Sequence, residues 1–400
     1  MIAVFQPCHL AGKTDAPPSK SLAHRYLIGA ALSGQKCTLT GVDFSEDILA
    51  SMDCLQALGA GITPEQNTVV VDPAGFMQTP DPVLECRESG STLRFFLPLA
   101  LCAGKTITLH GSDRLLERPL TVYEELCREN GFIFRKEKNA VTLCGSLKSG
   151  HYTIRGDISS QFITGLLFAL VYLGEDSSLT ILPPFESRSY VDLTLSVLRD
   201  FGADLDFTDP YTIEIRRSPL HAHSGRIEGD CSNAAFLDAF NHIGSAIEIG
   251  NLNPCSLQGD RVYTEYFRQI SQGTPTLDIS DCPDLGPVLI ALAAMKNGAL
   301  LTGTDRLKAK ESDRGAAMQA ELLKLGGGLT IGDNCITVPK KELRYPKTPL
   351  SGHNDHRIVM ALSVILSRTG GSISGAEAVR KSYPGFFDTI KQLGAKVELS

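Results

Sequence analysis

One supersecondary pattern recurs along the chain and constrains its fold more than any other feature. An amphipathic helix ends at a glycine, and two short strands separated by a turn follow it. The clearest copy spans residues 49–60 and continues through a turn at 65–67 into the apolar strand 69–71. Comparable helices end at five later glycines, which are Gly131, Gly202, Gly273, Gly327 and Gly394. The sequence therefore predicts six units of one type.

The spacing of these glycines supports a true repeat. Gly59, Gly131, Gly202 and Gly273 lie 72, 71 and 71 positions apart, and the two later intervals are 54 and 67. A second, almost wholly apolar helix is expected between the glycines, at residues 22–32, 92–102, 161–173, 285–295 and 357–366. Helices that are apolar all round are buried.

The length of the chain decides how six such units are grouped. Its 400 residues exceed the size at which one hydrophobic core keeps growing, so two domains are expected. Six inner helices do not easily share one core, whereas three per domain can be wrapped by sheets. We therefore predict a two-domain α/β protein, in which each domain has three βαβαββ units with helices inside and sheets outside.

Composition excludes several classes of protein. A net charge of -7 disfavours general binding to nucleic acid or to an anionic membrane. No stretch approaches the roughly eighteen apolar residues of a membrane-spanning helix. Eleven cysteines without a C-x-x-C pair argue against a disulfide framework and a zinc cage. A soluble cytoplasmic protein is expected.

Basic side chains occur where the helices are expected to begin. Lys20 and Arg25 lie in or near a first turn, Arg357 begins another helix, and Arg314 precedes the helical run 316–323. A helix N-terminus already carries about half a positive charge, so cations there indicate an anionic ligand. Serine, aspartate and asparagine at such positions are equally explained as caps.

If the inner helices of both domains point their N-termini at one cleft, six cations surround a site for more than one phosphate or carboxylate. Arg118 and Lys381, from neighbouring loops, complete this set. Asp284 and Glu311 would then be acids in a positive field, available for proton transfer.

Competing motifs fail on inspection. The segments 12–14 and 104–106 end like a Walker A loop but lack its earlier glycine. A metal site at residues 353–356 is disfavoured because Arg357 would repel a cation. The pair 159–160 lacks the G-x-S-x-G elbow of a serine nucleophile.

Nine segments, in this order and across nearly the whole chain, resemble the 5-enolpyruvylshikimate-3-phosphate synthase family of enolpyruvyl transferases. They are Ser19-Lys20-Ser21 with Arg25, Gly90-Ser91-Thr92 with Arg94, Glu117-Arg118-Pro119, Ser159-Ser160-Gln161-Phe162, Gly229-Asp230, Pro283-Asp284, Lys310-Glu311-Ser312-Asp313-Arg314, Asn354-Asp355-His356-Arg357, and Lys381 ahead of Pro384.

The resemblance implies a fold, a reaction and a domain division. The fold is a two-domain inside-out α/β barrel, with residues 1–17 and 229–400 in a discontinuous lower domain and 18–228 in an upper one. The reaction transfers the enolpyruvyl group of phosphoenolpyruvate to the 5-hydroxyl of shikimate 3-phosphate through a tetrahedral intermediate. It implies no metal or organic cofactor, and we expect a monomer whose partners are these two small molecules.

The resemblance also assigns roles to residues. The catalytic candidates are Asp284, to remove the hydroxyl proton, with Glu311 and Lys20 for proton transfer at C3 of phosphoenolpyruvate. The expected shikimate 3-phosphate contacts are Lys20, Ser21, Arg25, Ser159, Ser160, Gln161, Ser187, Asp284 and Lys310. The expected phosphoenolpyruvate contacts are Lys20, Gly90, Arg118, Gln161, Arg314, Arg357 and Lys381.

Departures from the family pattern keep two alternatives in view. Glu88 replaces a common asparagine, Phe95 a common proline, and Arg306 a usual asparagine. A UDP-N-acetylglucosamine enolpyruvyl transferase usually carries a cysteine in the loop that corresponds to residues 111–118, which has none here. A non-catalytic anion sensor is the other alternative. Glu88 favours it, whereas acids placed among the cations argue against it.

Overall fold

The computed structural model describes residues 1–400, which form two compact lobes. Lobe 1 comprises Met1–Pro17 and Gly229–Ser400, and lobe 2 comprises Pro18–Glu228. The chain passes between the lobes twice, and in each lobe a backbone hydrogen bond joins the two segments at these crossings. The N–H of Ser19 donates to the carbonyl of Glu228 at 2.8 Å, and the N–H of Asp230 donates to the carbonyl of Pro17 at 2.8 Å.

Lobe 2 contains three βαβαββ units, each with a four-stranded sheet. The third unit shows the arrangement best. Its first two strands are parallel, and its last two form an antiparallel hairpin beside them. Its elements are β10 (His151–Arg155), α6 (Ser160–Leu173), β11 (Ser177–Leu182), α7 (Arg188–Asp200), β12 (Asp204–Phe207) and β13 (Thr212–Arg216).

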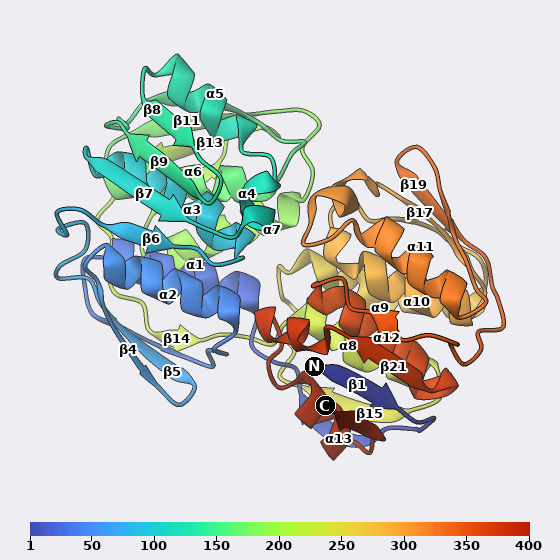
Figure 1. Cartoon of the computed structure of the whole chain (residues 1–400). Helices are drawn as coiled ribbons and strands as arrows, with labels where there is room; N and C mark the ends of the chain where they lie inside the picture. The colour runs from blue at the N-terminus through green and yellow to red at the C-terminus, as the bar shows by residue number, and fades with distance from the viewer. The chain divides into compact units, whose positions relative to one another are not determined.

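The second unit repeats this order with one short helix added. Its elements are β6 (Val83–Glu85), α3 (Gly90–Cys102), β7 (Thr106–His110), α4 (Asp113–Glu117), α5 (Thr121–Glu129), β8 (Ile133–Lys136) and β9 (Ala140–Cys144). Figure 1 shows α3 and α6 inside lobe 2, and these two helices contact each other along their length. Phe96 and Phe168, one from each helix, are fully buried in the core.

The first unit obtains its first strand from the far end of the lobe. Its local elements are α1 (Lys20–Leu32), β3 (Cys37–Thr40), α2 (Glu46–Ala57), β4 (Gly61–Glu65) and β5 (Thr68–Asp72). The two-residue strand β14 (Gly225–Arg226) pairs in parallel with β3, with Gly225 opposite Leu39. The sheet is thus completed by residues that are remote in sequence.

Lobe 1 contains two complete four-stranded sheets. One unit comprises β16 (Thr276–Asp278), η2 (Pro283–Leu285), α10 (Gly286–Met295), β17 (Ala299–Thr302), η3 (Asp305–Ala309), α11 (Arg314–Lys324), β18 (Thr330–Ile331) and β19 (Cys335–Val338). The other comprises β20 (Leu350–Ser351), α12 (His356–Thr369), β21 (Gly371–Ser374), η4 (Ala376–Lys381), α13 (Phe386–Gln392), β22 (Val397–Leu399) and the N-terminal β1 (Ile2–Phe5).

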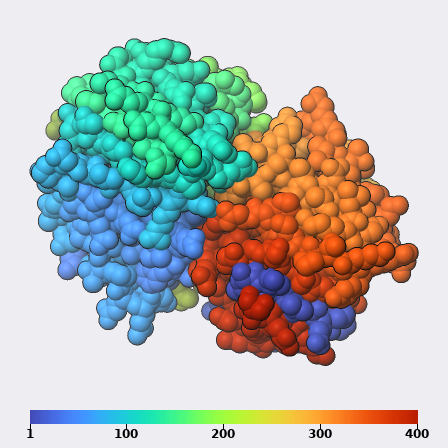
Figure 2. All heavy atoms as spheres, in the orientation of Figure 1, coloured from blue at the N-terminus to red at the C-terminus, as the bar shows by residue number.

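The N-terminal strand lies between two C-terminal strands. β1 is antiparallel to both β21 and β22, so Ala3 has Ile373 on one side and Leu399 on the other. Figure 2 shows the consequence at the surface, where N-terminal atoms in blue lie among C-terminal atoms in red.

The remaining unit of lobe 1 is incomplete, which corrects the prediction of three full βαβαββ units in each half. It comprises β2 (Ala11–Asp15), α8 (Cys231–His242), β15 (Ala246–Gly250), η1 (Gly259–Val262) and α9 (Tyr263–Gln272), and its sheet is the parallel pair β2 and β15. Only two residues separate Gly273 from β16, so no hairpin fits there. Gly273 is extended, with φ of -179°.

The other repeat glycines end their helices as predicted, with one shift. Gly59, Gly131, Gly202 and Gly394 have φ of 103°, 68°, 90° and 99°, which is the left-handed region that favours glycine. In the fifth copy the left-handed residue is Gly326, with φ of 80°, rather than Gly327. None of the helices combines the length and the apolar content that crossing a membrane requires.

Candidate active site

The segment before α11 places a cation at a helix N-terminus. The side chain of Asp313 caps the helix by accepting the N–H of Ala316 at 3.0 Å, the role that aspartate commonly has at a helix start. The helix begins at Arg314, two residues before the predicted run. The side chain of Arg314 is 1% exposed, so its charge needs partners inside the protein.

Three carboxylates surround the guanidinium of Arg314. Its Nε lies 2.9 Å from Asp355 Oδ2, its Nη1 2.8 Å from Asp284 Oδ1, and its Nη2 2.7 Å from Glu311 Oε2. Burial disfavours the cation, but these carboxylates outweigh burial and raise the pKa of Arg314. Its planar group therefore orients three acids at once.

Asp284 bridges three cations. Besides Arg314, it contacts Arg357, whose Nη2 is 2.8 Å from Oδ2, and Lys310, whose Nζ is 3.1 Å from Oδ1. Burial favours the protonated acid, yet Arg357, Lys310 and Arg314 hold the pKa of Asp284 well below its ordinary value. Burial and the neighbouring Arg306 and Arg314 lower the pKa of Lys310 to about 8, although Asp284 opposes this shift.

The turn before α12 supports the same group. Asp355 caps the helix by accepting the N–H of Arg357 at 2.9 Å. Lys381, in η4, donates from Nζ to the carbonyl of Asn354 at 2.7 Å. Lobe 1 thus supplies six of the predicted site residues from η2, the segment before α11, the starts of α11 and α12, and the end of η4. This Arg314 cluster comprises Asp284, Lys310, Glu311, Arg314, Arg357 and Lys381, with Asp355 among them.

Lobe 2 has its own polar group at the start of α3, which we call the Gly90 cluster (Gly90, Ser91, Arg94, Arg118 and Gln161). A Cβ on Gly90 would lie 2.8 Å from Arg118 Nη1 and 3.7 Å from Gln161 Oε1, so these three predicted residues are neighbours. Gln161 accepts from Arg94 Nη1 at 2.6 Å and donates to Ser91 Oγ at 2.9 Å. The amide is therefore held in one orientation.

The start of α1 carries two predicted cations in different settings. Lys20 is its first residue, and its Nζ lies 2.6 Å from Asp47 Oδ2. Arg25 is 2% exposed and donates to Ser21 O at 2.6 Å and to Thr194 Oγ1 at 2.9 Å. Burial lowers the pKa of Arg25 to about 10. Arg25 thus contributes to the packing of lobe 2 as well as to its charge.

The predicted serines lie at the starts of helices. The side chain of Ser159 accepts the N–H of Gln161 at 3.3 Å, which caps α6, and Ser160 is the first residue of that helix. Ser187 precedes α7 with φ of 53°, a left-handed conformation that is uncommon outside glycine.

Three residues that orient the site were not assigned to it from the sequence. Arg94 and Asp355 were quoted within family motifs but given no role. Asp47 had no signal at all, because it lies 27 residues from Lys20 in sequence and meets it only through the packing of α2 against α1.

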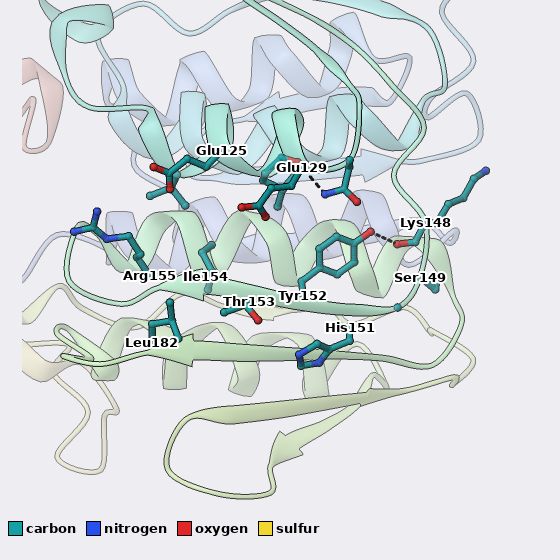
Figure 3. Close-up of a pocket in the computed structure, with 14 residues that line it drawn as sticks. Glu125, Glu129, Lys148, Ser149, His151, Tyr152, Thr153, Ile154, Arg155 and Leu182 are labelled. Carbon is teal, nitrogen blue, oxygen red and sulfur yellow. Dashed lines mark hydrogen bonds between the residues drawn. The ribbon is translucent and has the colours of Figure 1, made fainter.

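A separate groove of about 620 Å³ lies between α5 and β10 of lobe 2 and contains none of the predicted site residues (Figure 3). Glu125 and Glu129 line one side, and Lys148, His151 and Arg155 line the other. No group of three or more His, Cys, Asp or Glu side chains is arranged to hold a metal ion.

The fold and the site define an α/β protein whose helix starts carry arginines paired with acids, which is a candidate site for anionic substrates. Its similarity to known proteins shows its family. The sequence matches the family model of EPSP synthase (3-phosphoshikimate 1-carboxyvinyltransferase) over residues 4–390. The chain therefore belongs to this family.

Relatives and solved structures agree with that assignment. The chain is 38% identical to a 3-phosphoshikimate 1-carboxyvinyltransferase of Clostridium kluyveri, over 98% of this chain and 97% of the relative. It is 35% identical to one of Clostridium perfringens, over 98% of both chains. An EPSP synthase structure from Acinetobacter baumannii has the same fold, with a TM-score of 0.79, 23% identity, and coverage of 100% of this chain and 99% of the other.

Proposed function

We propose that the chain transfers the enolpyruvyl group of phosphoenolpyruvate to the 5-hydroxyl of shikimate 3-phosphate and releases phosphate, a step of aromatic amino acid biosynthesis. Membership of the family and the names of its relatives support this activity. The observation that carries it is the contact of the Asp284 carboxylate with Arg314, Arg357 and Lys310. Such a group can bind anions and keep a base among them.

We assign the ligands by charge and shape. Phosphoenolpyruvate carries a phosphate and a carboxylate, and the planar fork of arginine binds two oxygens of either group. Its proposed contacts are Lys20, Gly90, Arg118, Gln161, Arg314, Arg357 and Lys381. The proposed contacts of shikimate 3-phosphate are Lys20, Ser21, Arg25, Ser159, Ser160, Gln161, Ser187, Asp284 and Lys310.

The proposed reaction has an addition and an elimination. In the addition, the 5-hydroxyl oxygen bonds to C2 of phosphoenolpyruvate, Asp284 accepts the hydroxyl proton, and C3 is protonated. In the elimination, the C2–O bond to phosphate breaks and a proton leaves C3. Glu311 and Lys20 are the candidates for the proton transfers at C3, since each is ion-paired and only partly exposed.

The low pKa of Asp284 makes it a weak base in the ligand-free protein. An anion bound to Arg314 and Arg357 would share their positive charge with Asp284. That sharing raises the basicity of Asp284 at the moment when both substrates are bound. The base would therefore be activated by the substrate.

We further propose the finer features that family membership implies. The helices and sheets of each lobe would form one half of an inside-out α/β barrel, with the lobes acting as two domains. The enzyme would act as a cytoplasmic monomer and need no cofactor. Eleven free cysteines are consistent with a reducing compartment.

One assay separates this proposal from its alternatives. Phosphate release from phosphoenolpyruvate is measured with shikimate 3-phosphate, with UDP-N-acetylglucosamine, and with neither. We expect release with shikimate 3-phosphate alone. Release with UDP-N-acetylglucosamine instead would assign the chain to the related transferase. Binding of shikimate 3-phosphate without turnover would assign it to an anion sensor, the alternative that Glu88 favours.

A further inference from the structure

A buried carboxylate of α11 lies outside the Arg314 cluster and has no part in the proposed reaction. The side chain of Glu321 is 1% exposed, and its Oε1 lies 2.8 Å from His353 Nε2. Its Oε2 accepts the N–H of Ser351 at 3.0 Å and lies 2.8 Å from Lys324 Nζ. Two of its three partners belong to the turn that precedes α12.

That turn has an unusual backbone. His353 and Asn354 have φ of 50° and 52°, so two successive residues other than glycine are left-handed. Left-handed residues other than glycine are uncommon and persist only where their surroundings hold them. From α11, the carboxylate of Glu321 contacts the start of the turn at Ser351 and His353. Within the turn, Ser351 Oγ accepts the N–H of His353 at 3.1 Å.

The same turn orients three cations of the Arg314 cluster. The carbonyl of Asn354 accepts from Lys381 Nζ at 2.7 Å. The next residue, Asp355, accepts from Arg314 Nε at 2.9 Å and from the backbone N–H of Arg357 at 2.9 Å. A change in the turn therefore moves the partners of all three.

Helix geometry explains why one helix reaches the turn twice. Arg314 and Glu321 are seven residues apart in α11, which is about two turns, so both lie on one face. Arg314 contacts the end of the turn through Asp355, and Glu321 contacts its beginning through Ser351 and His353. The turn is held between these two points.

We propose that Glu321 and His353 are positioning residues for phosphoenolpyruvate. Their bond fixes the backbone of residues 351–355. Arg314, Arg357 and Lys381 are thereby held in the positions from which they bind the phosphate and carboxylate of that substrate. The inference rests on the proposed function, because it assigns these three cations to phosphoenolpyruvate.

The test compares two substitutions at His353, which meet the same left-handed backbone but differ in their contact with Glu321, with a control substitution in α11. His353→Leu removes the donor to Glu321, whereas His353→Gln keeps an N–H donor of similar reach. Lys324→Met is the matched control, because Lys324 also contacts Glu321 but lies outside the turn. We expect His353→Leu to raise KM for phosphoenolpyruvate about tenfold with a smaller change for shikimate 3-phosphate. His353→Gln should restore much of it, and Lys324→Met should behave as wild type.

A second readout needs no turnover. Amide hydrogen exchange at Ser351 and Asp355, measured in the ligand-free protein, should accelerate in His353→Leu and not in Lys324→Met. Wild-type KM and exchange in His353→Leu would overturn the positioning role, as would equal effects in Lys324→Met. A wild-type protein inactive with both substrates defeats the proposed function, and the exchange comparison then decides by itself whether Glu321 and His353 hold the turn.

Discussion

Asp284 Oδ1 and Arg314 Nη1 are 2.8 Å apart, so the proposed base and a residue proposed to bind phosphoenolpyruvate neutralise each other. Arg357 binds the other oxygen of the same carboxylate at 2.8 Å. Asp284 is thus ion-paired with the two arginines that we propose bind phosphoenolpyruvate, so a bound anion would compete with Asp284 for them.

Asp284→Ala should destabilise the ligand-free protein, because three cations lose their shared counter-charge. Removing one partner from such a buried group costs about 3 kcal/mol. Thermal unfolding measures the loss, and added sulfate should stabilise the variant more than the wild type by replacing the carboxylate. Asp305→Ala, which breaks an exposed pair with Lys308, is the control and should change little. Equal stabilisation of wild type and Asp284→Ala by sulfate would contradict the prediction.

Glu311→Gln should reduce kcat by about a hundredfold or more, the usual contribution of a proton-transfer group. Affinity for shikimate 3-phosphate should change far less, since the amide oxygen can still accept from Arg314. Asp313→Asn is the control, because asparagine also caps helices and Asp313 is exposed on the same loop. Steady-state rates and calorimetry provide the two measurements. Should turnover and binding fall equally, Glu311 is structural.

Gly90→Ala should weaken phosphoenolpyruvate binding. The new methyl group would lie 2.8 Å from Arg118 Nη1, so the guanidinium must shift. We expect KM for phosphoenolpyruvate to rise about tenfold, with KM for shikimate 3-phosphate nearly unchanged. Gly273→Ala serves as the control, because an added Cβ there meets nothing within 4 Å. An unchanged KM in Gly90→Ala would show that Arg118 does not bind this substrate.

Anion affinity should fall as pH rises through about 8. Burial, Arg306 and Arg314 lower the pKa of Lys310 to about 8 despite Asp284, so the amine is charged below that pH and neutral above it. A bound anion favours the charged form, so binding takes up a proton in this range. Sulfate is the suitable probe because its own charge is constant, and its affinity should drop about tenfold from about pH 7 to about pH 9.5. Lys310→Arg stays charged and should remove this dependence, and a persistent drop in that variant would exclude Lys310.

Much of the secondary structure was predictable because it depends on local periodicity. The apolar runs predicted at 161–173 and 285–295 correspond to α6 (Ser160–Leu173) and α10 (Gly286–Met295). The caps were predictable for the same reason, as Asp313 shows. The missing hairpin after Gly273 was not recognised, because a repeat inferred from glycine spacing does not show whether strands follow each copy.

The contacts between the site residues were harder to predict from the sequence than the residues themselves. Residue type identified Lys20, Asp284 and Arg314 as candidates, and the cationic helix starts indicated an anionic ligand. Which acid neutralises which cation depends on contacts such as Lys20 with Asp47, between residues far apart in the chain. The basicity of Asp284 depends on those contacts as well, so its low pKa could not be inferred from the sequence.

Local sequence was sufficient to predict the repeated helices that end at glycine, the helix starts and the residue types of a site for anions, because each depends on spacing within a few turns or on side-chain chemistry. Tertiary structure alone decided that β14 completes the sheet of β3, that β1 lies between β21 and β22, and that Glu321 holds the turn before α12. These pairings join segments that are distant in the chain. Their free energy comes from hydrogen bonds and burial that exist only once the whole lobe is packed, so no local pattern records them.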